Sequence, residues 1–252
     1  MKIDHPVPSQ YQQLTGLWQE AFGDTEEFID GFFCTAFSPA RCRCVVINKK
    51  VAAALYWMDV RLGKLRFAYI YAVAVEEKRR GKGLGKALLE DVQAHLTLRG
   101  YDGVLLVPGS ESLRGYYEKL GYSTCTHVHE FPARAGENPV ALQRIDREEY
   151  ARLRSVMLPE GSGLEEEENI AFLETMAFFY RGENLLLAAH AENGKLWCPE
   201  LLGDASAAPE ILKALNCAEG NFRTPGDTFP FAMFLPLTKD ARPPKHLGLA
   251  FD

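Results

Sequence analysis

The sequence predicts an α/β protein of two domains, because helix and strand patterns alternate along the chain and one polar segment divides it. The chain has 252 residues, enough for one large domain or two of ordinary size. Residues 132–139, PARAGENP, hold two prolines, a glycine and few apolar side chains, which is typical of a linker. The order of predicted elements is similar on both sides. We therefore expect domains over residues 1–133 and 140–252, the second a degenerate copy of the first.

The chain opens with two helix patterns. In residues 9–22, Ser9 can cap the helix, Gln12 completes a capping box, and the apolar residues form one stripe. Residues 24–37 predict a second helix, because acidic side chains in its first turn interact favourably with the helix dipole.

Strands and a third helix follow. Residues 42–60 predict two strands joined by a turn at Asn48, and residues 64–75 predict a long strand rich in β-branched and aromatic side chains. From residue 84 to about Gly100 the apolar residues recur every four positions, which indicates one face of a helix.

The remaining elements follow from the same criteria. In the first half they are a buried strand over 103–107, a helix over 110–122 that ends at Gly121, and an alternating strand over 122–131. In the second half they are helices over 146–157 and 163–180, a strand–turn–strand pair over 184–203, a helix over 208–215 and a strand over 229–237.

Composition excludes several classes of protein. A net charge of −6 disfavours a general nucleic-acid binder, which would present a basic face. The amino end lacks an apolar core of signal-peptide length, and the longest apolar run, residues 67–75, is far shorter than a membrane span of roughly 20 residues. We expect a cytoplasmic protein with no membrane partner and with free cysteines. Cys42 and Cys44 lack a second pair, so we expect no metal site.

Residues 76–90, EEKRRGKGLGKALLE, form a glycine loop between the long strand and the third helix. Backbone N–H groups and the helix dipole bind anions in such a loop, and glycines let the ligand approach. A P-loop would need glycine at Arg80 and a hydroxyl at Ala87. A dinucleotide fingerprint would need its third glycine at Lys86 or Leu88. A solvated basic turn would leave the three alternating glycines unexplained.

The pattern Arg80-x-x-Gly83-x-Gly85 resembles the pyrophosphate-binding motif of the GCN5-related N-acetyltransferases. LRGYYEKLGY, residues 113–122, resembles the second signature of that family, at the usual separation. The resemblance covers residues 1 to about 131, and the two-lobed layout is similar to bacterial acetyltransferases with an extra carboxy-terminal lobe. It implies a mixed, mostly antiparallel sheet flanked by helices, with a second, degenerate lobe of the same kind.

The resemblance also implies acetyl-coenzyme A as the acyl donor. Its pyrophosphate would bind the loop that comprises Arg80, Gly81, Lys82, Gly83, Leu84 and Gly85. Its pantetheine would lie along Val73, Ala74 and Val75, where a main-chain N–H would also polarise the thioester carbonyl. Ser110 stands where many relatives carry an asparagine that contacts the cofactor.

Tyr117 matches the general acid of the family, with the neighbouring Tyr116 as the alternative. The acceptor implied is a primary amine, of a small molecule or of a protein. The identity of the general base stays open, because the long strand lacks a carboxylate. The candidates are a water chain, Asp59, His127 and His129. Two other functions stay open: a non-catalytic acyl-CoA-binding or sensing protein, and a protein N-acetyltransferase whose second lobe docks the target.

Overall fold

The computed structural model describes residues 2–165 and 167–251, and the chain forms two compact units. The first unit comprises the residues up to 106 together with 110–123 and 234–243. The second comprises 107–109, 124–233 and the residues from 244 onward. Residues 1 and 252, the outer ends of the two predicted domains, lie outside the described part.

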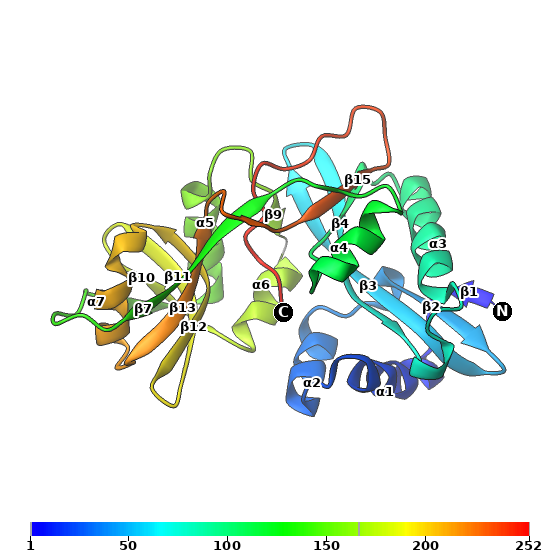
Figure 1. Cartoon of the computed structure of the whole chain (residues 1–252), viewed down its shortest axis with the longest axis horizontal. Coiled ribbons are helices and arrows are strands. Elements are labelled where there is room, and N and C mark those ends of the chain that lie inside the picture. Colours follow the sequence, from blue (N-terminus) through cyan, green and yellow to red (C-terminus); the bar gives the residue numbers. More distant parts are fainter. Residues whose placement is uncertain (1, 166, 252) are drawn as a thin grey trace. The chain divides into compact units, whose positions relative to one another are not determined.

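The first unit contains a mixed sheet (Figure 1). Its strands, in spatial order, are β1 (Lys2–Asp4), β2 (Cys42–Ile47), β3 (Lys50–Leu62), β4 (Leu65–Val75), β5 (Gly103–Leu106), β15 (Met233–Pro236) and β6 (Ser123–Thr124). Neighbours from β1 to β4 are antiparallel, whereas β4 and β5 are parallel. Asn48 and Lys49 form the predicted turn between β2 and β3, both with positive φ.

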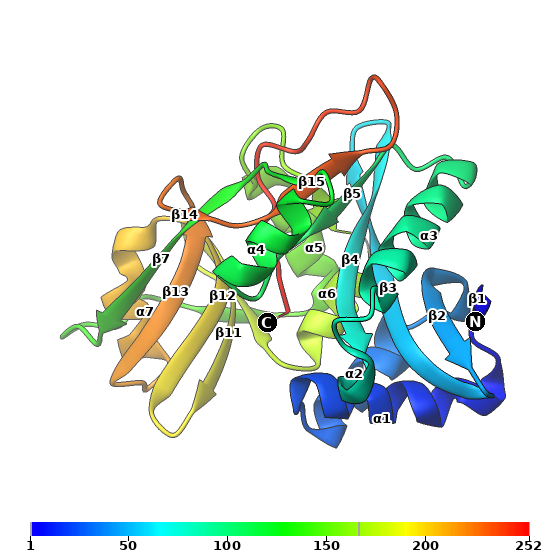
Figure 2. The same cartoon turned by 45° about the vertical axis from the view of Figure 1, so that its right-hand side comes forward.

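Helices cover both faces of this sheet. They are α1 (Tyr11–Phe22), α2 (Glu26–Thr35), α3 (Leu84–Leu98) and α4 (Glu111–Glu118), with short 3-10 turns η1 (Pro8–Gln10), η2 (Pro39–Arg41) and η3 (Glu77–Arg79). Successive strand residues point to opposite faces. Tyr56 of β3 packs on Trp18 of α1 at 5.3 Å, and the next residue, Trp57, packs near His95 of α3 at 5.9 Å. Therefore α1 and α3 lie on opposite faces, as Figure 2 shows.

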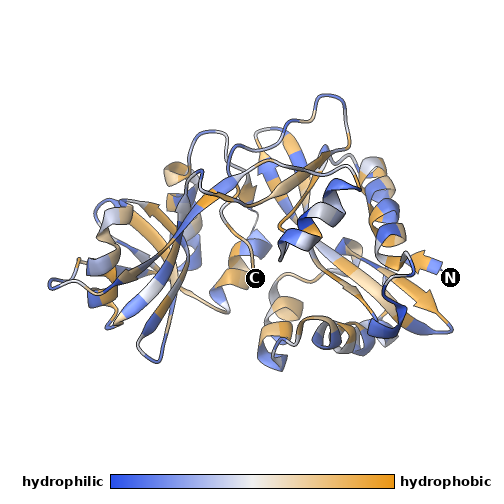
Figure 3. Ribbon diagram, in the orientation of Figure 1, coloured by the Kyte–Doolittle hydropathy of each residue, from blue (hydrophilic) through white to orange (hydrophobic). Residues whose placement is uncertain are grey.

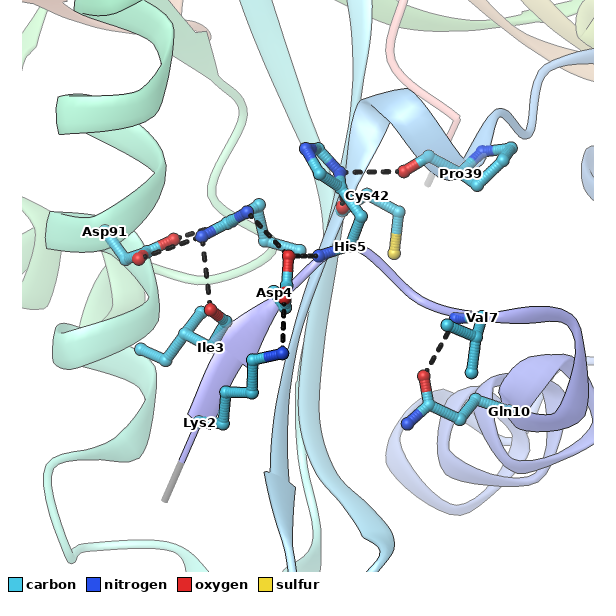
Figure 4. A network of polar contacts seen from close by, with 10 residues as sticks. Lys2, Ile3, Asp4, His5, Val7, Gln10, Pro39, Cys42 and Asp91 are labelled. Carbon is cyan, nitrogen blue, oxygen red and sulfur yellow. Dashed lines mark hydrogen bonds and ion pairs between the residues drawn. The ribbon is translucent and has the colours of Figure 1, made fainter.

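The first helix begins two residues later than the predicted cap. Ser9 lies in η1, and the side chain of Gln10 accepts a hydrogen bond from the Val7 amide at 2.9 Å (Figure 4). Proline at the start of η1 favours this tight turn, because its φ is already fixed and its N–H is not needed. Figure 4 also shows Asp4 and Asp91, which both pair with the guanidinium of Arg43 and join β1 and α3 to β2.

The second unit contains another mixed sheet. Its strands, in spatial order, are β14 (Phe229–Pro230), β7 (His127–Arg134), β13 (Glu219–Pro225), β12 (Lys195–Gly203), β11 (Leu185–Glu192), β10 (Phe178–Arg181) and β8 (Gln143–Ile145). The other elements are α5 (Arg147–Met157), β9 (Leu164–Glu165), α6 (Glu167–Glu174), η4 (Ala205–Ala207) and α7 (Ala208–Ala214). In Figure 3 apolar residues colour many positions along the strands of both sheets.

The two units repeat one arrangement. In the first, β3 and β4 are antiparallel, and α3 then leads to the parallel strand β5. In the second, β11 and β12 are antiparallel, and α7 leads to the parallel strand β13. Two mostly antiparallel sheets flanked by helices confirm the predicted fold class.

The boundary between the units differs from the predicted linker at 132–139. Pro132, Ala133 and Arg134 are the end of β7, which pairs with β13 in the second sheet. The strand predicted over 229–237 divides into β14, which joins the second sheet, and β15, which joins the first. Alternation along a strand predicts which side chains face a core, and it does not specify which sheet provides that core.

The helix predicted over 163–180 also differs. It ends at Glu174, and Phe178–Arg181 form β10, which pairs with β8 and β11. Aromatic side chains favour strands when they have neighbours to pack on. The ring of Phe179 stacks on Tyr150 of α5 with centroids 4.1 Å apart.

A buried cluster of charged groups lies within the second unit. Arg154 donates to both carboxylate oxygens of Glu200, at 2.6 and 2.8 Å, and it pairs with Glu165 at 2.7 Å. Tyr150 donates to Glu200 at 2.6 Å. The nearby His246 belongs to the carboxy-terminal segment, which is anchored where the Leu249 amide donates to Glu165.

Candidate active site

The glycine loop lies between the end of β4 and the start of α3. Gly81 and Gly83 have φ of +72° and +79°, which side chains other than glycine rarely adopt. An added Cβ at either position would meet nothing within 4 Å, so the backbone is open to a ligand. Gly83 is also the N-cap of α3, and it supplies no side chain to satisfy the first amides of the helix.

A continuous run of backbone amides is therefore unpaired. The N–H groups of Gly81, Lys82 and Gly83 donate to no protein acceptor in the described part of the chain. The next three amides, of residues 84–86, belong to the first turn, which has no intrahelical acceptor. The first bond of the helix runs from the Ala87 amide to the Gly83 carbonyl at 3.0 Å. Six successive donors at a helix N-terminus can bind an anion.

The basic side chains of the loop have different partners. Arg80 donates through Nε to the carbonyl of Val75 at 3.1 Å, which ties the loop to β4. Lys82 donates to a backbone carbonyl at 2.9 Å. Neither of these two pairs with a carboxylate among the described residues, so their charges are available to an anionic ligand. Two other basic side chains pair with Glu76 instead: Lys78 and Arg79.

One edge of β4 is open beside this loop. Parallel pairing between β4 and β5 covers Phe67 to Tyr69 and ends where Tyr69 meets Leu105. The strand then continues to Val75, and no described strand pairs with that stretch on the β5 side. The backbone groups of Val73, Ala74 and Val75 therefore lie at an unpaired edge, where an extended ligand can add like a strand.

A bulge distorts β4 at the same place. On β3, Ala54 pairs with Ala74 while Tyr56 pairs with Tyr71, so two residues of β4 oppose one of β3. The two are Ala72 and Val73, and Ala72 has a φ of +48°. A non-glycine residue with positive φ costs roughly 1 kcal/mol or more, and such strain is concentrated at functional sites. The bulge redirects backbone groups at the open edge.

Two adjacent tyrosines of α4 face different surroundings. Tyr117 is 8% exposed and packs between Tyr116 and Tyr122, with ring centroids 5.4 and 5.7 Å away. Burial raises the pKa of Tyr117 to about 12, so its hydroxyl stays protonated at neutral pH. Tyr116 is 36% exposed, and its hydroxyl oxygen lies 3.6 Å from the position that a Cβ on Gly85 would occupy.

Ser110 is the N-cap of α4. Its hydroxyl oxygen accepts a hydrogen bond from the Leu113 amide at 3.2 Å and lies 3.0 Å from the hydroxyl of Ser112. The local role of this side chain is to satisfy the first turn of the helix.

The candidate bases lie in other parts of the fold. Both carboxylate oxygens of Asp59 are engaged, one by the Tyr101 hydroxyl at 2.6 Å and the other by Arg66 at 2.8 Å. Asp59 pairs with Ala68, toward the opposite end of β4 from the bulge. His127 and His129 belong to β7 of the second unit, where the His129 ring bonds to Thr228. The contacts of Asp59 and His129 indicate structural roles.

The open edge, the bulge at Ala72 and the position of Tyr116 beside Gly85 were not foreseen from the sequence. A small residue between Tyr71 and Val73 is a weak signal for a bulge, because strands also contain alanine in regular positions. In the described residues no three His, Cys, Asp or Glu side chains are grouped to hold a metal ion. Nor is any described helix long and apolar enough to cross a membrane.

The loop of unpaired amides thus lies beside the unpaired edge of β4. Residues 2–125 match the family described as acetyltransferase (GNAT) domain. These residues, just under half of the chain, form an acetyltransferase (GNAT) domain. A comparison with curated protein sequences finds no significant match.

Solved structures show the same fold over nearly the whole chain. A GCN5-related N-acetyltransferase from Kribbella flavida aligns with a TM-score of 0.69 at 20% identity, covering 94% of this chain and 72% of the other. A GCN5-related N-acetyltransferase from Anabaena variabilis aligns with a TM-score of 0.71 at 13% identity, covering 94% and 73%. At such low identity these similarities establish the fold alone.

Proposed function

We propose that this protein transfers the acetyl group of acetyl-coenzyme A to a primary amine. The observation that carries the proposal is the run of six unpaired amides over residues 81–86, placed next to the open edge of β4. Membership of an acetyltransferase family supports acyl transfer as the reaction class. The loop matches a diphosphate in charge and in hydrogen-bonding type, and the strand edge matches the amide groups of a pantetheine arm.

Each part of the site has a distinct role in this reaction. The loop amides, with Arg80 and Lys82, bind the diphosphate, and the edge over residues 73–75 orients the thioester. A neutral amine attacks the thioester carbonyl carbon, and a main-chain N–H at the bulge stabilises the resulting oxyanion. The carbon–sulfur bond then breaks, and the Tyr117 hydroxyl gives its proton to the departing thiolate. The nitrogen loses its extra proton to solvent.

Replacement of Gly83 tests the donor site. Gly83→Glu adds a carboxylate where the diphosphate is expected, and it forces a side chain onto a positive φ. Calorimetry should find one coenzyme A per wild-type chain and no measurable binding to Gly83→Glu. Gly63→Glu is the matched control, because Gly63 also has a positive φ and open space but lies in the β3–β4 turn. Unchanged affinity of Gly83→Glu would place the site elsewhere.

Turnover distinguishes an enzyme from an acyl-CoA sensor. Acetyl-coenzyme A should release free thiol in the presence of at least one member of a panel of amines, and peptides with free amino groups belong in the same panel. Binding of coenzyme A without thiol release from any acceptor would favour the sensing function.

The second unit is proposed not to bind the donor. At the turn before α7, the Asp204 carboxylate already accepts the amide and hydroxyl of Ser206. Pro209, in the first turn of α7, has no N–H to offer. A titration that gives two coenzyme A molecules per chain would contradict this.

A further inference from the structure

Tyr116 places a hydroxyl group at the amino end of α3. The Cβ position of Gly85 lies 3.6 Å from the Tyr116 hydroxyl oxygen and 3.7 Å from Cγ2 of Val75. Cα–Cβ bonds in a helix tilt toward its N-terminus. The hydroxyl therefore flanks the first turn of α3, close to the unpaired amides of residues 84–86.

This hydroxyl has no partner in the protein. Among the described residues no hydrogen bond involves the side chain of Tyr116, although it is partly withdrawn from water. Packing does not require the oxygen, since the ring contact with Tyr117 would be the same for phenylalanine. By contrast, Tyr122 on the other side of Tyr117 does have a partner, because its hydroxyl accepts from Gln93 at 3.3 Å.

We propose that the Tyr116 hydroxyl donates a hydrogen bond to the diphosphate of the acyl donor and is a further donor-binding residue. This inference rests on the proposed function, because it assumes that the anion at residues 81–86 is the diphosphate of coenzyme A. The two tyrosines then have different roles. Tyr116 on the exposed side of α4 contributes to donor affinity, and the buried Tyr117 contributes to chemistry.

The absence of a side chain at Gly85 is part of the same arrangement. A methyl group there would stand in van der Waals contact with both Val75 and the Tyr116 hydroxyl. The methyl group would occupy the space between the Tyr116 hydroxyl and the N-terminus of α3. A phosphate oxygen must enter this space to bond to both the hydroxyl and the helix amides. Glycine at this position therefore keeps the Tyr116 hydroxyl and the amides accessible to one ligand.

Removal of the hydroxyl tests the assignment. Calorimetry with coenzyme A should show roughly tenfold weaker binding to Tyr116→Phe, the loss expected for one hydrogen bond to a charged group. A nuclear magnetic resonance titration with pantetheine, which lacks the diphosphate, should show unchanged affinity. In steady-state assays the KM for acetyl-coenzyme A should rise while kcat stays the same. Tyr122→Phe is the control, because Tyr122 also contacts Tyr117 but its hydroxyl already bonds to Gln93, and it should bind coenzyme A like the wild type.

The outcomes separate this inference from the proposed function. If the wild type binds coenzyme A and Tyr116→Phe binds it equally well, the inference fails and the proposed function stands. An equal loss for coenzyme A and pantetheine would also overturn it, because the hydroxyl would then act on the pantetheine arm or on the fold. If neither the wild type nor Gly83→Glu binds coenzyme A, the proposed function fails, and this inference fails with it.

Discussion

His246 should make the second unit less stable in acid. Its side chain is 5% exposed, and burial lowers its pKa from the ordinary 6.5 to about 4; the charge of Glu200 raises this pKa by less, and the charge of Arg154 lowers it further. As the pH falls through 6.5, the unfolded chain binds a proton that the folded protein does not accept until about pH 4. The contribution of a neutral His246 is therefore complete above pH 6.5 and is lost as the pH falls toward 4.

The size of the effect follows from the difference in pKa. One pKa unit corresponds to about 1.4 kcal/mol, so the free energy of unfolding should fall by about 2 kcal/mol at pH 5 and by about 3 kcal/mol below pH 4. The carboxyl of Glu165 acts in the opposite direction, because burial raises its pKa and the folded protein then binds a proton more readily than the unfolded chain. Only a comparison with a variant that lacks His246 isolates the contribution of this histidine to the pH dependence of the free energy of unfolding.

His246→Gln supplies that comparison, because glutamine stays neutral at every pH. Urea unfolding of both proteins, followed by circular dichroism at several pH values from about 7.5 to 5, gives the difference in their free energies of unfolding. That difference should shift by about 2 kcal/mol in favour of the variant over this range. His129→Gln, on the β7–β14 edge, should follow the wild-type profile. A difference that stays constant within about 0.5 kcal/mol would show that His246 is not buried as a neutral group.

Three other perturbations test separate parts of the structure. Tyr117→Phe should lower kcat about 100-fold with donor affinity nearly unchanged, because general acid catalysis is lost; full turnover would exclude Tyr117 as the acid. Gly103→Val should destabilise the protein by roughly 1–3 kcal/mol in urea unfolding, because its Cβ would collide with the ring of Phe234; Gly16→Ala, in open space on α1, is the control and should cost nothing. A fragment of residues 1–133 should be poorly soluble or unfolded, because it lacks β15 and so exposes the edge of β5 that pairs with β15; a monomeric fragment with cooperative unfolding would contradict this.

Local chemistry in the sequence was sufficient for the glycine loop and for the helix that follows it. The alternating glycines of residues 81–85 occur where backbone conformation requires them, and Gly81 and Gly83 do adopt positive φ. The spacing from Leu84 to Leu96 predicted α3 because a helix places those side chains on one face. These features depend on residues near one another in the chain, so a single sequence can specify them.

The tertiary structure decided what depends on distant partners. β6 and β7 are consecutive strands, as are β14 and β15, yet the members of each pair join different sheets, because pairing depends on which strand edges are free. The bulge at Ala72 arises from a mismatch in register with β3, and Tyr116 meets Gly85 only because α4 packs beside the start of α3. Neither the bulge nor the contact between Tyr116 and Gly85 changes the local residue pattern. The sequence therefore determined the glycine loop and α3, whereas the open strand edge and the hydroxyl beside the loop required the folded chain.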